Sequence, residues 1–319
     1  MPGATIVPII ISSDKTHLTT FGNKTAYPVY LIIGNLPKEI RRKPSRHGYI
    51  LLGYLPTTKL SHIKNKSRRR RRALANLFHK CMKRILEPMV EAGKSGMSVT
   101  SADGKVCRGH PILACYVSDY QEQVLVTGTR TGDCCTCGCE NCNLGDCAHC
   151  SGPRDMDAVR CILYKRNSDP AAFKKACREA GLKPIAHPFW ENLPYTNIFS
   201  TITPDILHQL YQGVIKHVVS WITLALGAEE IDARCARLPP QHDMRIFLKG
   251  ISGLSRVTGK EHGQIASFML GLVVDAKLPG NVLPFLLVSA IRAILDFLYL
   301  AQYPLHTSET LALLKDALH

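Results

Sequence analysis

Acidic residues and uninterrupted apolar runs are both scarce in this chain of 319 residues, which has 25 Asp and Glu against 40 Lys and Arg. Its first residues, MPGATIVPII, lack the basic segment that opens a secretory signal, so we expect none. The most apolar stretch, residues 282–301, carries Arg292 and Asp296, which favours a buried amphipathic helix over a membrane span. The composition also excludes collagen-like, disordered and small disulfide-rich proteins. We therefore expect one large domain or two smaller ones, with no membrane partner.

Positive charge is concentrated in one part of the chain. Between Lys38 and Val90 there are 16 Lys and Arg and two acidic residues, so this part supplies +14 of the net charge of +15. A basic region on an otherwise near-neutral chain favours a polyanion as partner, nucleic acid first and an anionic membrane surface second. A solvated basic face is the alternative, because charge alone specifies little.

The densest part of this region has seven cations in nine positions: Lys64, Lys66, Arg68, Arg69, Arg70, Arg71 and Arg72. Adjacent like charges repel one another, so a polyanion that neutralises them is favoured. These residues are candidates for binding DNA phosphates or for a nuclear-localisation signal. An exposed turn before a helix is the alternative interpretation.

Seven of the 13 cysteines fall between Cys134 and Cys150, which is too dense for a disulfide framework in a chain of this length. Six of them form three C-x-x-C pairs: Cys134 and Cys137, Cys139 and Cys142, and Cys147 and Cys150. Two thiolates at this spacing can face one metal ion, and tetrahedral zinc needs four ligands. The cluster predicts a structural Zn²⁺ site in a reducing compartment, with the choice of ligands left open. A cysteine-rich loop without metal is the alternative.

Hydrophobic patterning predicts strands early in the chain and helices later. Short apolar, β-branched runs predict strands over residues 4–12, 26–34, 49–55 and 111–117, with 123–127 as a further candidate. An apolar period of 3.6 residues predicts a helix over 73–90, between the third and fourth strands. Beyond the irregular segment 131–152, the same period predicts helices over 171–180, 204–226, 245–254, 261–274, 282–303 and 308–319.

Asp14 follows the first predicted strand and Asp119 follows the fourth. Carboxylates at strand ends can point out of the sheet edge, and two of them brought together would hold Mg²⁺ or Mn²⁺ for displacement at phosphorus. Taken alone, each is more readily explained as an ordinary turn or capping aspartate. Farther along, Asp205 and His208 are three residues apart on one predicted helical face, where they could share a metal or a hydrogen bond. Glu261 opens another predicted helix, where the helix dipole favours a negative charge in any case.

A family likeness extends over several long segments. They are SSDKTHLTTFGNKTAYPVYLIIGNLPKEIRRKPS (12–45), LLGYLPTTKL (51–60), RRALANLFHKCM (71–82), HPILACYVSDYQEQVLVTGTRTGDC (110–134), PFWENLPYTNIFSTITPDILHQLYQGVIKH (188–217) and FLKGISGLSRVTGKEHGQIASFMLGLVVD (247–275). In these segments, which cover nearly all of the chain, the sequence resembles the Plavaka-type transposases. Fungal DNA transposons related to the CACTA and Kyakuja–Dileera–Zisupton groups encode these proteins.

The resemblance implies an RNase H-like core with a DDE triad, which cuts transposon ends and joins them to target DNA with two divalent metals, Mg²⁺ or Mn²⁺. In that core the first Asp is on the first strand and the second on the fourth, which matches Asp14 and Asp119. The third carboxylate sits on a late helix, where Glu261 matches; Glu229 and Glu230 are further candidates.

The resemblance also implies two short motifs. A C/D-x-x-H motif between the second Asp and the Glu matches Asp205 and His208. A C-x-x-C soon after the second Asp matches Cys134 and Cys137, and the further cysteines through Cys150 depart from the family pattern. We expect the chain to be part of a longer transposase, because the first strand begins near residue 4 and the last predicted helix runs to the end.

We therefore expect an α/β protein: an RNase H-like mixed-sheet core, a Cys-rich zinc segment, a helical insertion and C-terminal helices. The expected divisions are residues 1–130, 131–152, 153–245 and 246–319. The expected activity is DDE-type transposition in the nucleus, with transposon-end and target DNA as partners; a homo-oligomer is left open. The alternative is a catalytically inactive, transposon-derived protein that binds nucleic acid and zinc.

Overall fold

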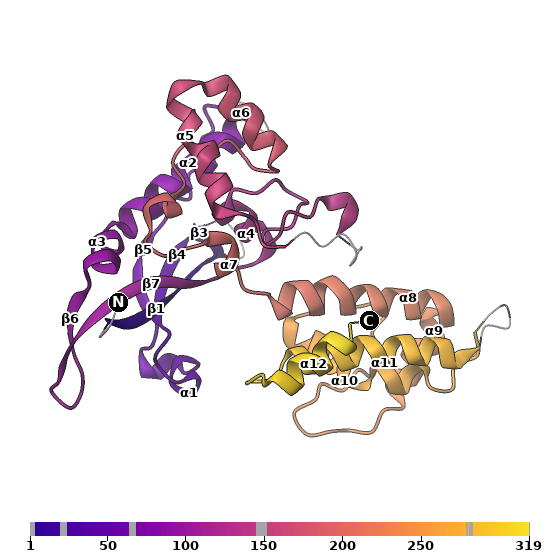
Figure 1. Cartoon of the computed structure of the whole chain (residues 1–319). Helices are drawn as coiled ribbons and strands as arrows, with labels where there is room; N and C mark the ends of the chain where they lie inside the picture. The colour runs from indigo at the N-terminus through magenta and orange to yellow at the C-terminus, as the bar shows by residue number, and fades with distance from the viewer. Residues whose placement is uncertain are drawn as a thin grey trace. The chain divides into compact units, whose positions relative to one another are not determined.

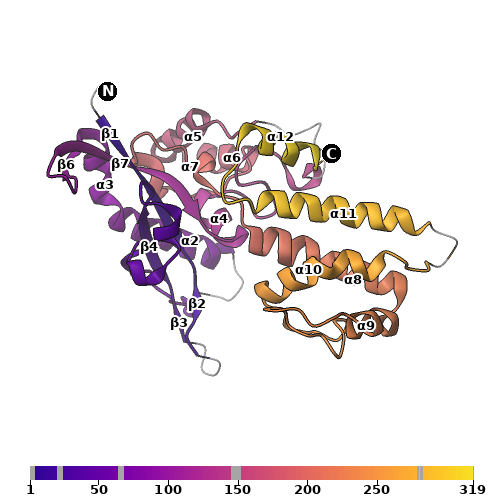
Figure 2. The same cartoon turned by 90° about the horizontal axis from the view of Figure 1, so that it is seen from below.

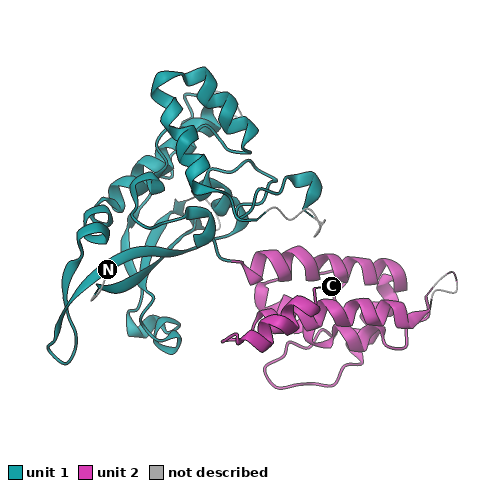
Figure 3. Cartoon of the chain, in the orientation of Figure 1, with its two compact units in different colours: residues 1–203 teal, residues 204–319 magenta. Residues whose placement is uncertain are grey.

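A computed structural model describes residues 4–19, 24–63, 68–144, 152–278, 280 and 283–318 of the chain. The chain divides into two compact units, Met1–Thr203 and Pro204–His319, which Figure 3 colours separately. The first unit contains every strand that the structure describes, and the second is helical. Each unit has its own hydrophobic core.

The first unit is built on a curled five-stranded mixed sheet, labelled in Figures 1 and 2. The strand order is β5-β4-β1-β7-β6, and a separate two-stranded ribbon pairs β2 with β3. β1 pairs antiparallel with β4 and parallel with β7, while β4–β5 and β6–β7 are antiparallel. The bounds are β1 Ala4–Ser13, β2 Thr16–His17, β3 Thr25–Ala26, β4 Pro28–Ile33, β5 Ile50–Tyr54, β6 Met97–Thr100 and β7 Val106–Val117.

Helices cover this sheet and connect its strands. α2 and α3 join β5 to β6, and α3 and α7 pack against β7. The helices and short turns of the first unit are α1 Lys38–Arg41, η1 Pro44–Arg46, α2 Arg68–Ile85, α3 Glu87–Ser95, α4 Tyr120–Thr127, η2 Asn141–Asn143, α5 Met156–Ser168, α6 Pro170–Glu179, η4 Phe189–Asn192 and α7 Ile198–Thr201.

The core of the first unit forms where the apolar face of α2 meets the sheet. In β1, alternate residues point to opposite faces, so Ile9 and Ile11 are both buried. Phe78 and Met82 are four residues apart on α2 and lie in the same core cluster. The strands expected over 4–12, 26–34, 49–55 and 111–117 are confirmed. The helix expected over 73–90 begins earlier, at Arg68, and divides at Leu86 into α2 and α3.

The second unit packs helices around a separate core that includes Ile222, Ile265 and Met269. Its elements are the π-helix η5 Ile206–Ile215, α8 Lys216–Leu226, α9 Ala228–Ala236, α10 Gly259–Val273, α11 Pro284–Ala301 and α12 Ser308–Asp316. α11 is the one helix among the described residues that is long and apolar enough to cross a membrane, judged by length and composition. A single such helix is weak evidence for a span. The sequence analysis expected this helix to be buried, but only 17% of its apolar window is buried in the structure.

Two sequence-based expectations about secondary structure are wrong. Residues 123–127 form part of helix α4 and not a fifth strand, because the Asp119 side chain caps the helix at its start. Residues 245–254 form no helix. Gly250 has φ +75° there and lies so close to Asp232 that an added Cβ would clash with it, and the backbone N–H groups of Ile251 and Ser252 donate to Asp232 Oδ1 at 2.8 and 2.9 Å.

Candidate functional site

Asp14 and Asp119 lie at the carboxyl ends of two neighbouring parallel strands. Ser12 of β1 pairs with Val117 of β7, and each aspartate follows two residues after its member of that pair. Parallel strands end at the same edge of a sheet, so both aspartates are at this edge. Both also line one cavity of about 750 Å³ in the first unit. The structure thus brings these two residues to the same site.

Asp119 also has a structural task. Its carboxylate Oδ1 accepts a hydrogen bond of 2.8 Å from the backbone N–H of Glu122, which caps α4. The capping interpretation from the sequence is therefore correct for Asp119. A capped helix end holds the carboxylate in a fixed position beside the cavity, which is also what a metal ligand requires.

Glu122 is a residue of this site that the sequence analysis missed. Its carboxylate accepts hydrogen bonds from the Tyr27 hydroxyl at 2.6 and 2.5 Å and from the Ser13 hydroxyl, whose oxygen is 2.7 Å from the Tyr116 hydroxyl. The network joins the end of β1, the end of β7, α4 and the start of β4. The signal available in the sequence was the capping spacing from Asp119, since Glu122 lies in the first turn of the helix.

Burial controls the charge of Glu122. Desolvation raises the pKa of its carboxyl to about 7, hydrogen bonds from Ser13 and Tyr27 oppose the rise, and the charges of Asp119 and Asp14 add to it. This carboxyl therefore titrates near neutral pH.

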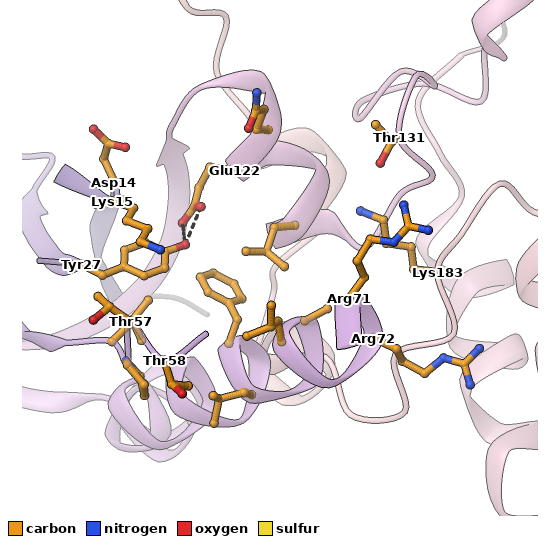
Figure 4. Close-up of a pocket in the computed structure, with 18 of the residues that line it drawn as sticks. Asp14, Lys15, Tyr27, Thr57, Thr58, Arg71, Arg72, Glu122, Thr131 and Lys183 are labelled. Atoms are coloured by element: carbon orange, nitrogen blue, oxygen red, sulfur yellow. Dashed lines mark hydrogen bonds between the residues drawn. The ribbon is translucent and has the colours of Figure 1, made fainter. Parts of the chain in front are cut away.

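The opposite wall of the cavity is cationic. Arg68, Arg71 and Arg72 of α2 line it together with Lys183, and Figure 4 shows Arg71, Arg72 and Lys183 at the end away from Asp14. Burial lowers the pKa of the Lys183 ammonium, and the nearby Arg71 charge lowers it further. The first turn of α2 has no acidic residue, so its arginines are repelled by the positive end of the helix dipole as well as by one another. An anion bound here would reduce the repulsion among the cations and the repulsion from the dipole.

The other cations of the predicted basic run do not line this cavity or lie outside the described residues. Arg70 donates to the backbone oxygen of Lys59, and Arg69 is exposed in the first turn of α2. Lys64 and Lys66 lie outside the described residues. The structure thus brings three of the seven predicted DNA-binding residues to the cavity.

Glu261, Asp205 and His208 belong to the second unit. The Thr258 backbone N–H donates to the Glu261 carboxylate at 2.8 Å and the Glu261 backbone N–H donates to the Thr258 hydroxyl oxygen at 3.3 Å, which forms a capping box. Arg245 pairs with the same carboxylate. These contacts lower the pKa of Glu261. Asp205 Oδ1 accepts from the backbone N–H of Leu207 at 2.9 Å, and Asp205 Oδ2 is hydrogen-bonded to His208 Nδ1.

At the first C-x-x-C pair of the cysteine segment, one sulfur accepts two backbone hydrogen bonds. The backbone N–H groups of Thr136 and Cys137 both donate to the Cys134 sulfur at 3.4 Å. Burial opposes ionisation, but these donors and the Arg154 charge lower the pKa of the Cys134 thiol, which favours the thiolate that binds metal.

The other predicted zinc ligands do not gather around a common point in the described residues. Cys139 donates to the backbone oxygen of Glu140 at 3.6 Å, and Cys142 is exposed. Cys147 and Cys150 lie outside the described residues. Within the described part of the chain, no three His, Cys, Asp or Glu side chains converge in a way that could hold a metal ion.

The fold and the cavity together define a mixed α/β protein with carboxylates at one end of a concave site and cations at the other. A family model described as Plavaka transposase matches residues 1–222. The chain therefore belongs to the Plavaka transposase family, which confirms the resemblance seen in the sequence and implies DNA as a partner. A comparison with curated proteins found no match.

Proposed function

We propose that this chain carries the catalytic core of a DDE-type transposase, which cuts transposon ends and joins them to target DNA in the nucleus. The observation that carries the proposal is the shared cavity of Asp14 and Asp119, at the ends of adjacent parallel strands and opposite a cationic wall. Carboxylates at one end and cations at the other suit a phosphodiester that must be bound and then attacked.

The sheet supports an RNase H-like core. Three antiparallel strands, β1, β4 and β5, are followed by helices α2 and α3 and then by the antiparallel pair β6 and β7, of which β7 is parallel to β1. This is the strand order in which the two aspartates of such a core become neighbours.

In this proposal a divalent metal would be held at the cavity by carboxylates. Mg²⁺ in proteins is held by one or two carboxylates together with substrate phosphates, and Asp14 and Asp119 would supply those carboxylates. Bound ions of this kind neutralise charge on the phosphate and activate the attacking oxygen. Glu261 is proposed as the third carboxylate, and Asp205 with His208 as the C/D-x-x-H motif, on the family likeness.

The chain's own cations would hold the DNA backbone. Arg71, Arg72 and Lys183 line the cavity, where they would contact phosphates. Phosphate contacts position a strand and do not select its sequence. Cys134 and Cys137, with further thiols of the same segment, are proposed to hold a structural Zn²⁺.

Replacing each aspartate by asparagine tests the proposal. Asn is a good helix cap, so Asp119→Asn removes the charge and retains the cap of α4. We expect Asp14→Asn and Asp119→Asn each to lower Mn²⁺-dependent nicking of plasmid DNA more than about 100-fold, since even indirect partners of metal ligands cost 10–100-fold. DNA affinity, measured by filter binding, should stay within about threefold, because these residues are not the cations that neutralise phosphates.

Asp103→Asn is the matched control, because Asp103 is an exposed turn residue of the same unit, ion-paired with Lys105. It should nick as the wild type does. Equal nicking by all three variants would contradict the metal role of Asp14 and Asp119. A wild type that binds DNA and never nicks it would favour the inactive, DNA- and zinc-binding alternative.

A further inference from the structure

The cavity beside Asp14 and Asp119 has an apolar floor that phosphate binding does not explain. Tyr27 and Phe78 lie on it with their rings stacked, 6.2 Å between centroids. Leu74 and Leu77 of α2 also line it. Both leucines are only half-buried and stand outside the hydrophobic core that Phe78 enters, so they present apolar surface to the cavity.

Charged groups lie toward both ends of the cavity. Asp14, Lys15 and Glu122 stand toward one end and Arg71, Arg72 and Lys183 at the other, as Figure 4 shows. The occupant must therefore combine negative charge with a flat or apolar body. A volume of about 750 Å³ exceeds what a phosphate group alone would fill.

Paired DNA cannot supply such a body. In a duplex the bases are stacked inside, and phosphates and sugars face the protein. A nucleotide taken out of the stack can lay its base against aromatic and apolar side chains, while its phosphates remain with the cations. Thr57 and Thr58 line the cavity as well and could hydrogen-bond a base edge.

We infer that this cavity accommodates one unpaired nucleotide of the DNA strand, next to the phosphodiester to be cut. Its base lies against the half-buried Leu74 and Leu77, over the buried ring of Phe78, and its phosphates meet Arg71 and Lys183. The inference rests on the proposed function and specifies its substrate: a strand locally unpaired at the reacting position. Stacking on such a floor tolerates any base, so it adds affinity without sequence choice.

The experiment compares two DNA duplexes of the same sequence, one fully paired and one with a single unpaired 2-aminopurine nucleotide. Binding to the full chain is measured by anisotropy without divalent cation, so that no strand is cut. We expect the wild type to bind the bulged duplex about tenfold more tightly, in line with the contribution of one stacked base. The 2-aminopurine emission should change on binding, because the base leaves its stack.

Leu77→Asn keeps the number and branching of the side-chain heavy atoms and removes apolar surface from the floor, so the preference should fall below about threefold while paired-duplex affinity stays unchanged. Leu224→Asn is the control, since Leu224 is 84% exposed on α8 of the other unit. If Leu77→Asn lowers the melting temperature, Leu74→Asn replaces it.

Equal wild-type affinity for both duplexes would overturn the inference, as would a preference that survives in both leucine variants. A free deoxynucleoside monophosphate that competes as well as the bulged duplex would also overturn it, since the site would then serve a free nucleotide. The proposed function fails separately, when nicking does not depend on Asp14 and Asp119. The two tests are therefore distinguishable.

Discussion

The two units use the same polar residue types in different ways. In the first unit, Glu122 is buried against the hydroxyls of Tyr27 and Ser13, beside a cavity. In the second unit, Glu261 closes a capping box and pairs with Arg245, and Asp232 holds a loop. The first arrangement raises the pKa of a carboxyl and the second lowers it. The surroundings of a carboxylate, more than its position in a motif, therefore decide its chemistry.

Two buried histidines, His79 in the first unit and His262 in the second, differ in how completely their ring nitrogens are hydrogen-bonded. Both ring nitrogens of His79 are bonded: Nε2 lies 3.0 Å from the Leu125 carbonyl oxygen, and Nδ1 accepts from the Phe189 N–H at 3.3 Å. His262 in the second unit is buried less deeply, and no hydrogen-bond partner of its Nδ1 is found among the described residues. The contrast holds between these two positions and not between the units, because Nε2 of the buried His110 in the first unit also has no partner among the described residues.

Glu261→Gln is the strongest test of whether the carboxylates of the second unit have only a structural role. Gln also completes a capping box, so this change removes the charge and keeps the helix start. If Glu261 is the third carboxylate, nicking falls more than about 100-fold with little change in unfolding free energy.

Thr258→Ala is the reverse control for Glu261. It removes the cap at a cost of about 1 kcal/mol and leaves the carboxylate, so nicking should persist. A Glu261→Gln protein that nicks normally would limit Glu261 to its structural role and confirm the contrast between the units.

Zinc removal should affect only the first unit. We expect one equivalent of zinc per chain by atomic absorption, lost in Cys134→Ser, because a structural zinc site needs its thiolates. Trp190 is buried in the first unit, so its fluorescence in a Trp221→Phe background reports the stability of that unit. Cys161→Ser, at an exposed cysteine outside the segment, is the control. A Cys134→Ser protein that retains its zinc would contradict the assignment.

The two histidines should differ on replacement. His79→Leu leaves the Phe189 N–H and the Leu125 carbonyl buried without partners, which costs about 2–4 kcal/mol. His262→Leu removes a ring whose Nδ1 has no hydrogen-bond partner among the described residues, so no bond of that atom is lost. The unfolding free energy should therefore change by less than about 1 kcal/mol. Urea unfolding followed by circular dichroism measures both. Equal losses would show that His262 is as well bonded as His79.

The pH dependence of stability should reveal Glu122. Its pKa is about 7 when folded and near 4.5 when unfolded, so between these values the folded chain binds more protons. The unfolding free energy contributed by Glu122 is complete below pH 4.5 and falls as pH rises through 7, by up to about 3 kcal/mol. Urea unfolding of wild type and Glu122→Gln at pH 5 and pH 8 measures this difference.

Glu191 provides the control of opposite sign. Burial opposes its ionisation, but Lys83 and Arg166 at 2.8 and 2.7 Å lower its pKa. Its stabilisation is therefore present above pH 4.5 and lost only as pH falls below that value. Glu191→Gln should show a constant offset from wild type between pH 5 and pH 8. A constant offset for Glu122→Gln as well would contradict the raised pKa.

Local patterns were enough to predict most elements and the two aspartates. β-branched runs predicted β1, β4, β5 and β7 of the five-stranded sheet and missed the short edge strand β6. The order of the predicted strands along the chain was enough to pair Asp14 with Asp119 in expectation. The strand predicted over 123–127 is a helix, because the Asp119 cap starts a helix there in spite of the β-branched residues. The prediction failed over 245–254 because a loop held by Asp232 replaces the periodic helix.

By itself the sequence determined the family, the basic region and the strand order, because these depend on residue identity and short-range spacing. Only the tertiary structure decided that Glu122 is buried against Tyr27 and that Arg71 and Lys183 share a cavity with Asp14. These residues are far apart along the chain, and their contacts depend on how helix α2 packs on the sheet. Desolvation and charge proximity arise only from that packing, so no spacing rule could have predicted them.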